Sequence, residues 1–348
     1  MPEILVDILK VKDLYSGLGQ FSANFAQALI AARRTANKVK FLAPPGHAEL
    51  ISEGTGVVHP SLLRRYFPAL NKPYDLWHSL HQFPSFHPHP RSKWILTVHD
   101  LNFLVEKDRS KAQRYLQRLQ RNVDKSHAVT AISAFTKSEL EKHVDLRGKP
   151  VHVIHNGVVM PSGNPAPKPQ RPYFLSLGVF KEKKNFHVLL PILKDFPDHD
   201  LVLAGNNATP YGTSIKERIR VLGLEDRVQM PGAVEDQEKF RLFSNCDALL
   251  FPSLAEGFGL PVIEAMLLGK PVFLSRATSL PEIGGDAAFY FDSEQPATIT
   301  HSIRSGLSAF VADPHKVEQR MKTHAAKFTW AACILKYIEL YAEVLEQV

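Results

Sequence analysis

The stretch EGFGLPVIE, residues 256–264, sets two acids eight positions apart around two glycines and a proline. DALLFPS, residues 247–253, precedes it and is typical of a buried parallel strand. PVIEAMLLGKP, residues 261–271, predicts a short helix, because proline suits the first helical position and a glycine followed by a proline ends a helix. Residues 254–260 are therefore a predicted strand-to-helix loop at the carboxyl end of a strand, where open α/β sheets bind ligands.

The residue types in this loop suit a phosphorylated ligand. Gly257 and Gly259 let the backbone approach a ligand closely, and the amides of the loop and of the first helical turn can donate to an anion. Glu264 lies one turn into the predicted helix, where it could reach a ribose hydroxyl. Glu256 precedes the turn and is expected near the group that the anion carries.

Apolar, β-rich segments alternate with amphipathic helical segments along the whole chain. The candidate strands are EILVDIL (3–9), KVKFLA (38–43), YDLWHSL (74–80), KWILTVHD (93–100), HAVTAIS (127–133), VHVIHNG (151–157), YFLSLGV (173–179), DLVLAG (200–205), VQMPG (228–232), DALLFPS (247–253) and PVFLS (271–275). The candidate helices include 18–33, 108–124, 212–222 and 235–245. This alternation predicts parallel sheets covered by helices, that is, an α/β fold.

Length and composition indicate a soluble globular protein of two domains. The 348 residues suffice for two domains, and VMPSGNPAPKPQRP, residues 159–172, is a predicted linker because its prolines fit neither a helix nor a central strand. We therefore expect two Rossmann-like domains facing a cleft. No signal-peptide pattern or long apolar run is found, and the two cysteines have no metal or redox spacing. A reduced, cytoplasmic protein is expected.

The positive charge is concentrated in the first part of the chain. Residues 1–150 hold 22 Lys and Arg against 13 Asp and Glu, whereas the remaining residues are slightly acidic. A basic surface attracts phosphate-rich partners, although it can also serve solubility alone. The predicted helix 107–125 has Tyr115, Leu119 and Val123 at helical spacing, so it is either a solvated outer face or a dock for anionic lipid or a lipid-diphosphate acceptor. No nucleic-acid-binding signature is found.

Beyond these patterns, FPSLAEGFGLPVIEAMLLGKPV, residues 251–272, resembles the signature of family 4 of the retaining, nucleotide-sugar-dependent glycosyltransferases. The resemblance implies the GT-B fold, with two Rossmann-like domains and the donor held mainly by the second. It implies an acceptor-binding domain over 1–158, a donor-binding domain over 173–328 and a final helix, 329–348, that crosses back onto the first domain.

Three further segments resemble the family and supply site residues. GVFKEKKN, 178–185, resembles the loop that gives cations to the donor diphosphate. YSGLGQFSANF, 15–25, resembles the glycine loop, although Ser16 stands where a glycine is usual. TVHDLNFL, 97–104, resembles the segment with a histidine near the donor sugar. A nicotinamide site is disfavoured, because the third glycine of G-x-G-x-x-G is missing after residue 19.

The resemblance implies the following roles. The expected catalytic residues are His99, Glu256, Lys184 and Asp100, where Asp100 could instead cap the next segment. The expected donor-binding residues are Gly17, Gly19, Lys183, Gly257, Phe258, Gly259, Leu260 and Glu264. Lysines and amides would stabilise the leaving diphosphate without a metal or other cofactor, and retention would follow from front-face attack. Val158 replaces the acid that usually follows Asn-Gly, which puts that acid's contact in doubt.

The donor and the acceptor are less defined. SLPEIGGDAAFYFD, 279–292, resembles the mannosyltransferase-like branch and favours GDP-mannose over a UDP-linked hexose. A saccharide or lipid-linked acceptor of bacterial lipopolysaccharide or other surface polysaccharide is expected, on the inner face of the plasma membrane. The alternatives are a nucleotide-sugar epimerase or phosphorylase of the same fold, and a non-catalytic partner subunit.

Two other constellations fit metal sites poorly. Asp198-His199-Asp200 matches a D-x-D motif but falls in a predicted helix-to-strand turn. HSLHQFPSFHPHP, 78–90, contains four histidines with irregular spacing and stiffening prolines, which favours a loop near the acceptor over zinc.

Overall fold

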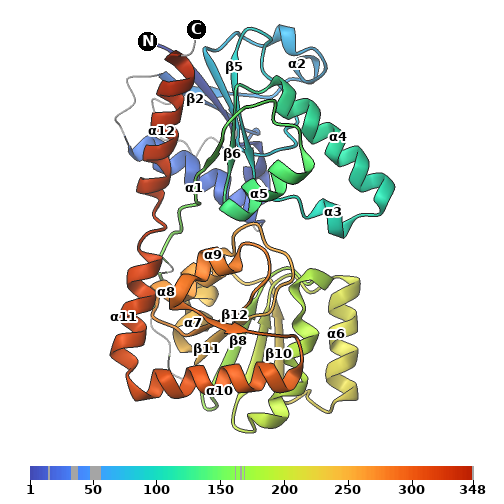
Figure 1. The fold of residues 1–348 in the computed structure, drawn as a ribbon, viewed down its shortest axis with the longest axis vertical. Coiled ribbons are helices and arrows are strands. Elements are labelled where there is room, and N and C mark those ends of the chain that lie inside the picture. The colour runs from blue at the N-terminus through green and yellow to red at the C-terminus, as the bar shows by residue number, and fades with distance from the viewer. Residues whose placement is uncertain are drawn as a thin grey trace. The chain divides into compact units, whose positions relative to one another are not determined.

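The computed structural model describes residues 1–14, 16–32, 38–47, 56–160, 162–164, 167 and 169–346. It divides into two compact units, which are Met1–Gly157 with Phe328–Val348, and Val158–Lys327 (Figure 1). Tyr15 and parts of the predicted linker, residues 161, 165–166 and 168, lie outside the described residues. Among the described residues, no helix combines the length and the apolar character needed to cross a bilayer.

The first unit is built on a sheet of seven parallel strands in the order β3-β2-β1-β4-β5-β6-β7. The strands are β1 Glu3–Asp7, β2 Lys38–Leu42, β3 Gly56–Val58, β4 Leu76–Ser79, β5 Lys93–Val98, β6 Ala128–Ala131 and β7 Val151–Val153. The helices are α1 Gly17–Ala31, α2 Leu62–Tyr66, α3 Phe103–Glu106, α4 Arg109–Lys125, α5 Ala134–His143 and α12 Trp330–Glu346, with short 3-10 helices η1 Leu9–Lys12 and η3 Pro68–Leu70.

The C-terminal helix α12 completes the core of the first unit. Its buried Tyr337 and Tyr341 lie in one apolar cluster with Phe25 of α1 and with residues of β1 and β4. His78 of β4 is fully buried, and its Nδ1 lies 2.7 Å from the Tyr341 hydroxyl while its Nε2 lies 2.8 Å from Thr97 Oγ1. The expected return of the last helix to the first domain is confirmed, and His78 is part of the contact that holds it.

The second unit contains six parallel strands in the order β10-β9-β8-β11-β12-β13. The strands are β8 Tyr173–Leu177, β9 Asp200–Ala204, β10 Val228–Gly232, β11 Ala248–Phe251, β12 Val272–Ser275 and β13 Phe289–Phe291. The α-helices are α6 Pro210–Val221, α7 Asp236–Asn245, α8 Leu260–Leu267, α9 Leu280–Gly284, α10 Pro296–Ala312 and α11 Pro314–Ala325. The crossover from β8 to β9 uses the 3-10 helices η4 Glu182–Lys184, η5 Phe186–Leu189 and η6 Pro191–Asp195.

The predicted α/β architecture is confirmed. Each of the eleven candidate strands contains a strand of the structure, and the four candidate helices correspond to α1, α4, α6 and α7. The strands β3 and β13, which have three residues each, were not predicted. Since all strands in each sheet are parallel, their carboxyl ends gather at one edge, and loops that follow neighbouring strands meet there.

Candidate functional site

The loop predicted over 254–260 and the helix predicted within 261–271 are present at the carboxyl end of β11, and the helix covers Leu260–Leu267. Helix α8 starts at Leu260 with Pro261 in its first turn, and the chain after it turns at Gly269 with φ 73°. Gly259 precedes the helix at φ 103°, a left-handed conformation that favours glycine. A β-carbon there would lie 3.0 Å from Leu280 Cδ2. The glycine therefore permits both the turn and the close packing of the loop on α9.

The loop after β8 and the loop after β11 are joined by an ion pair. Lys184 Nζ lies 2.6 Å from Glu256 Oε1, and both side chains are largely buried. The ammonium also lies 4.7 Å from the centre of the Phe251 ring. Gly178 leaves room for the lysine stem, because a β-carbon at that position would lie 2.5 Å from Lys184 Cε. Two expected catalytic residues, 72 positions apart, are thus in contact.

Backbone contacts fix the same loops. The Leu254 amide donates to the Lys183 carbonyl at 2.7 Å. The Glu256 amide donates to Thr278 Oγ1 at 2.9 Å, and Ser279 Oγ donates to the Glu256 carbonyl at 3.0 Å. Thr278 and Ser279 follow β12, so three neighbouring strand ends hold the glycine loop. Rigid placement of this kind is what a binding loop requires.

Glu264 is buried one turn into α8 and is paired with a lysine that the sequence did not indicate. Lys239 Nζ of α7 lies 2.5 Å from Glu264 Oε1. Burial raises the pKa of Glu264, and the nearby Lys239 ammonium opposes that rise. The other oxygen, Oε2, is buried and has no hydrogen-bond partner among the residues that the structure describes. The carboxylate therefore keeps a buried acceptor that a ligand hydroxyl could use.

In the first unit, the two expected glycines have different surroundings. Gly17 is exposed, and a β-carbon there would meet nothing within 4 Å. Gly19 is buried, and a β-carbon there would lie 1.9 Å from the Asp13 carbonyl oxygen. The Gly19 amide donates to Ser16 Oγ at 3.1 Å, so the serine that replaces a family glycine is the N-cap of α1. Gly19 thus has a packing role that the sequence did not reveal.

His99 follows β5 and is buried in a fixed orientation. Its Nε2 lies 2.8 Å from the Leu80 carbonyl oxygen, and since a carbonyl only accepts, Nε2 carries the proton and Nδ1 is an acceptor. The Phe21 ring meets the imidazole edge-on at 4.7 Å. Burial lowers the pKa of His99 to about 4, so the ring is neutral at pH 7. The histidine can accept a hydrogen bond but does not bring a positive charge.

Gln82 positions the segment that carries His99 and Asp100, and sequence reasoning missed it. Its Oε1 accepts from the His99 amide at 3.2 Å, and its Nε2 donates to the Asp100 carbonyl at 2.9 Å. Asp100 Oδ1 accepts from the Asn102 amide at 3.0 Å, which forms an Asx turn before α3, whose N-cap is Asn102. Nothing local could have identified Gln82, because its partners follow the neighbouring strand β5.

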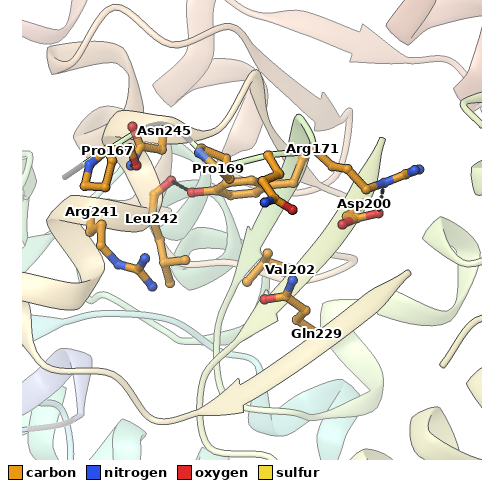
Figure 2. Close-up of a pocket in the computed structure, with 11 residues that line it drawn as sticks. Pro167, Pro169, Arg171, Asp200, Val202, Gln229, Arg241, Leu242 and Asn245 are labelled. Carbon is orange, nitrogen blue, oxygen red and sulfur yellow. Dashed lines mark hydrogen bonds and ion pairs between the residues drawn. The ribbon is translucent and has the colours of Figure 1, made fainter. Parts of the chain in front are cut away.

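The remaining candidate constellations have structural contacts. Asp200 begins β9 and lies 3.1 Å from Arg171 Nε. A cavity of about 320 Å³ occupies this amino-terminal end of the sheet, with Asp200, Arg171 and Tyr173 in its wall (Figure 2). It therefore lies at the opposite end of the strands from the glycine loop.

In α4, Leu119 and Val123 are buried, so only the polar face of this basic helix is available to a partner.

Comparison with known proteins matches both halves of the chain to glycosyltransferases. Residues 17–160 match the family described as Glycosyltransferase Family 4, and residues 163–328 match that described as Glycosyl transferases group 1. The O-antigen chain mannosyltransferase B of Escherichia coli is 25% identical, with 95% of this chain and 97% of the relative covered. The O-antigen chain mannosyltransferase RfbU of Salmonella typhimurium is also 25% identical, with 87% and 90% covered.

Solved structures agree on the fold. The structure of Anabaena Alr3699/HepE in complex with UDP and glucose has a TM-score of 0.73 and 19% identity, and all of each chain is covered. At this identity the likeness concerns the fold alone, which is GT-B. The expected residues fall in two groups: Gly17, Gly19, His99 and Asp100 belong to the first unit, and Lys183, Lys184 and Glu256 to Glu264 belong to the second.

Proposed function

The chain belongs to the family 4 glycosyltransferases, and from this premise we propose that it transfers a hexosyl group, mannose, from a nucleoside-diphosphate sugar with retention of anomeric configuration. The observation that carries the proposal is the Lys184–Glu256 pair, 2.6 Å apart, beside a left-handed glycine turn at the carboxyl end of β11. The positive charge of Lys184 suits a diphosphate leaving group, because negative charge builds on the diphosphate as its bond to C1 of the sugar breaks.

Lys184 and the loop amides would take the diphosphate. A donor phosphate competes with Glu256 for the Lys184 ammonium, because both are anions and only one can occupy its near face. On donor binding, the lysine would turn to phosphate and Glu256 would be released to accept hydrogen bonds from sugar hydroxyls. The start of α8 and the residues Gly257 to Leu260 add the positive end of a helix dipole, and Lys183 adds a second cation.

Glu264 would bind the ribose. Its buried Oε2 lacks a partner among the described residues, and a buried acceptor without a hydrogen bond is costly unless a ligand satisfies it. The Lys239 ammonium favours the ionised, accepting form of the carboxylate. His99, neutral and with an accepting Nδ1, would orient a donor-sugar hydroxyl, and Gly17 and Gly19 would border the phosphates.

No side chain is assigned as nucleophile in this proposal. Asp100 already accepts a hydrogen bond from the Asn102 amide, so it is kept as a secondary candidate only. The leaving diphosphate oxygen would itself accept the proton of the attacking hydroxyl on the same face of the sugar, which gives retention. Lysines and amides would stabilise the leaving charge, with no metal or other cofactor required.

The relatives support the donor and the pathway class. Both are O-antigen chain mannosyltransferases and cover almost all of this chain, which favours GDP-mannose and a lipopolysaccharide-type saccharide or lipid-linked acceptor. A fold relative was solved with UDP and glucose, so UDP-glucose is the alternative donor. In this proposal the protein would transfer the sugar to a lipid-linked acceptor at the cytoplasmic face of the plasma membrane.

The test is a transfer assay with purified full-length protein. Thermal stabilisation by GDP-mannose and UDP-glucose identifies the donor, because a ligand at 100 times its Kd adds about 2.7 kcal/mol. NMR of the product made with a glycolipid acceptor then reports the anomeric configuration, with EDTA present in one arm. An inverted product, or loss of activity in EDTA that a divalent cation restores, contradicts the mechanism. Conversion of donor without acceptor into a new nucleotide sugar indicates an epimerase, and binding without turnover indicates a non-catalytic subunit.

A further inference from the structure

Five large apolar side chains are exposed within nine residues of the first unit. They are Leu62 at 72%, Leu63 at 66%, Tyr66 at 70%, Phe67 at 60% and Leu70 at 56% relative exposure. They belong to α2, Leu62–Tyr66, and to the η3 segment, Pro68–Leu70, with Phe67 between them, and neither short helix has a buried residue. Figure 1 shows α2 at the edge of the unit. We call Ser61–Leu70 the apolar knuckle.

An exposed apolar cluster of this density is unusual for a soluble surface. Single exposed apolar residues are normal, whereas contiguous ones mark sites of interaction. In the knuckle, Leu62 and Tyr66 are four positions apart, as are Leu63 and Phe67, so each pair lies on one side of the helical turn. Leu62 and Leu63 are exposed, so packing in the core does not explain why these positions are leucines. The segment therefore presents apolar groups outward instead of using them in the core.

The knuckle itself has a positive charge. Ser61–Leu70 contains Arg64 and Arg65 and no Asp or Glu, whereas Lys72, outside the knuckle, is paired with Glu3. The Arg65 guanidinium lies 6.0 Å from the centre of the Tyr66 ring, so cationic and aromatic groups are side by side. Arginine and tyrosine both suit the boundary between headgroups and acyl chains, since each has an apolar body and a polar end.

We propose that the apolar knuckle inserts into the headgroup region of a bilayer that contains anionic phospholipids. Leucine and phenylalanine side chains would enter the acyl boundary, while Arg64 and Arg65 would contact lipid phosphates. A second copy of this chain is the other candidate occupant. Its surface would have to complement Arg64 and Arg65, and a self-complementary interface would bring those same arginines together.

The knuckle differs from the basic helix that the sequence suggested as a lipid dock. In α4, Leu119 and Val123 are buried in the core of the unit. That helix therefore offers charged side chains to a membrane, but its apolar face is not available for insertion. The knuckle has both. The contribution of α4 is electrostatic alone, whereas the knuckle combines apolar insertion with electrostatic attraction by Arg64 and Arg65. Salt should therefore weaken the contribution of α4 more strongly than that of the knuckle.

The experiment measures flotation of the full-length protein with phosphatidylcholine vesicles that contain or lack phosphatidylglycerol as the anionic lipid. The triple variant Leu62→Ser/Leu63→Ser/Phe67→Ser should lower the partition coefficient for anionic vesicles by more than about tenfold, because apolar insertion is lost. Arg64→Gln/Arg65→Gln should lower it about fivefold per arginine. The matched controls are Val221→Ser/Val311→Ser, at 68% and 75% exposure in the second unit, and Lys216→Gln/Arg218→Gln.

A second measurement reports insertion directly. In the variant Phe67→Trp, the added indole emission should shift to the blue on adding anionic vesicles and should be quenched by brominated acyl chains. Because no residue of α2 is buried, circular dichroism and Tm should stay unchanged in all these variants. These vesicles contain no glycan or nucleotide sugar, so the result is independent of transferase activity.

Three outcomes would overturn the proposal. They are flotation of the triple variant equal to that of the wild type, absence of wild-type flotation with anionic vesicles, and an indole emission in the Phe67→Trp variant that lipid leaves unchanged. Sedimentation that shows a concentration-dependent dimer, lost in the triple variant while vesicle binding is unaffected, would assign the knuckle to a second copy of the chain instead.

Discussion

The second unit holds charged pairs at the carboxyl ends of its strands, whereas the first unit holds neutral, buried histidines at the same ends. Lys184–Glu256 and Lys239–Glu264 keep partial access to solvent, and each charge faces an opposite one. His81 and His99 follow β4 and β5, and burial lowers the pKa of both. The difference teaches that a group shielded from solvent can remain charged where an opposite charge faces it, whereas the imidazoles, which have no such partner among the described residues, are neutral.

Removal of Lys184 should have the largest effect. Lys184→Ala is expected to lower kcat/KM by roughly two to three orders of magnitude, about 3 kcal/mol, because one donor to the leaving charge is lost. The matched control is Lys181→Ala, an exposed lysine of the same loop. Steady-state kinetics and thermal melting check it.

A loss of stability in Lys184→Ala would come from the unpaired Glu256 carboxylate. The double variant Lys184→Ala/Glu256→Ala should then recover the wild-type Tm but not the transfer rate. Full activity of Lys184→Ala would remove the contrast between the units, because charge in the second unit would then have no catalytic use.

The two glycines of α1 separate packing from ligand access. Gly19→Ala should destabilise the protein by about 2–3 kcal/mol, since the new β-carbon would lie 1.9 Å from the Asp13 carbonyl oxygen and backbone atoms cannot move away cheaply. Gly17→Ala, with open space around it, should leave the free energy of unfolding nearly unchanged. Denaturant titration measures both. Equal effects of the two changes would contradict the packing role of Gly19.

Acid should destabilise the first unit more than the second. Burial lowers the pKa of His78 to about 3 and of His99 to about 4. Below pH 6.5 the unfolded chain therefore binds more protons than the folded chain, and the free energy of unfolding decreases as the pH decreases. Asp7 opposes this, since burial raises its pKa to about 6 and favours the folded state as pH falls. Together these three groups predict a net loss of about 2 kcal/mol between pH 7 and pH 5.

Hydrogen exchange followed by mass spectrometry at both pH values assigns this loss. Protection of β4, β5 and α12 should fall more than protection of β8 and β11. The same loss in both units, or none, would show that the histidines do not distinguish them.

The smallest effect is expected at Glu264. Lys239→Met removes the ammonium that opposes the raised pKa of Glu264, so the carboxyl becomes protonated at higher pH. Nucleotide affinity that depends on an accepting carboxylate should then fall more in the variant than in the wild type as pH decreases from 8 to 6. Calorimetry with GDP at the two pH values measures it, with wild type as the reference. A nucleotide affinity of the variant that does not depend on pH would contradict the assignment of Glu264 as the residue that binds the ribose.

The sequence by itself determined the eleven strands, the loop at 254–260 and the α8 that follows it, because each is specified by local patterns: apolar runs, left-handed glycines and a proline at the helix start. Its signature residues also determined the family. Roles for single residues were less accessible, as Gly19 and Asp100 show.

Only the tertiary structure decided which distant groups meet. Glu256 contacts Lys184 across 72 positions, Glu264 pairs with Lys239 of another helix, and Gln82 holds the His99 backbone across two strands. The exposure of the apolar knuckle is of the same kind, because the packing of the whole unit decides whether its apolar side chains are covered. The physical reason is that a local pattern determines which secondary structure a segment forms and which of its faces is apolar. The residues that a side chain contacts depend instead on which parallel strands are neighbours, because their carboxyl ends lie at one edge of the sheet.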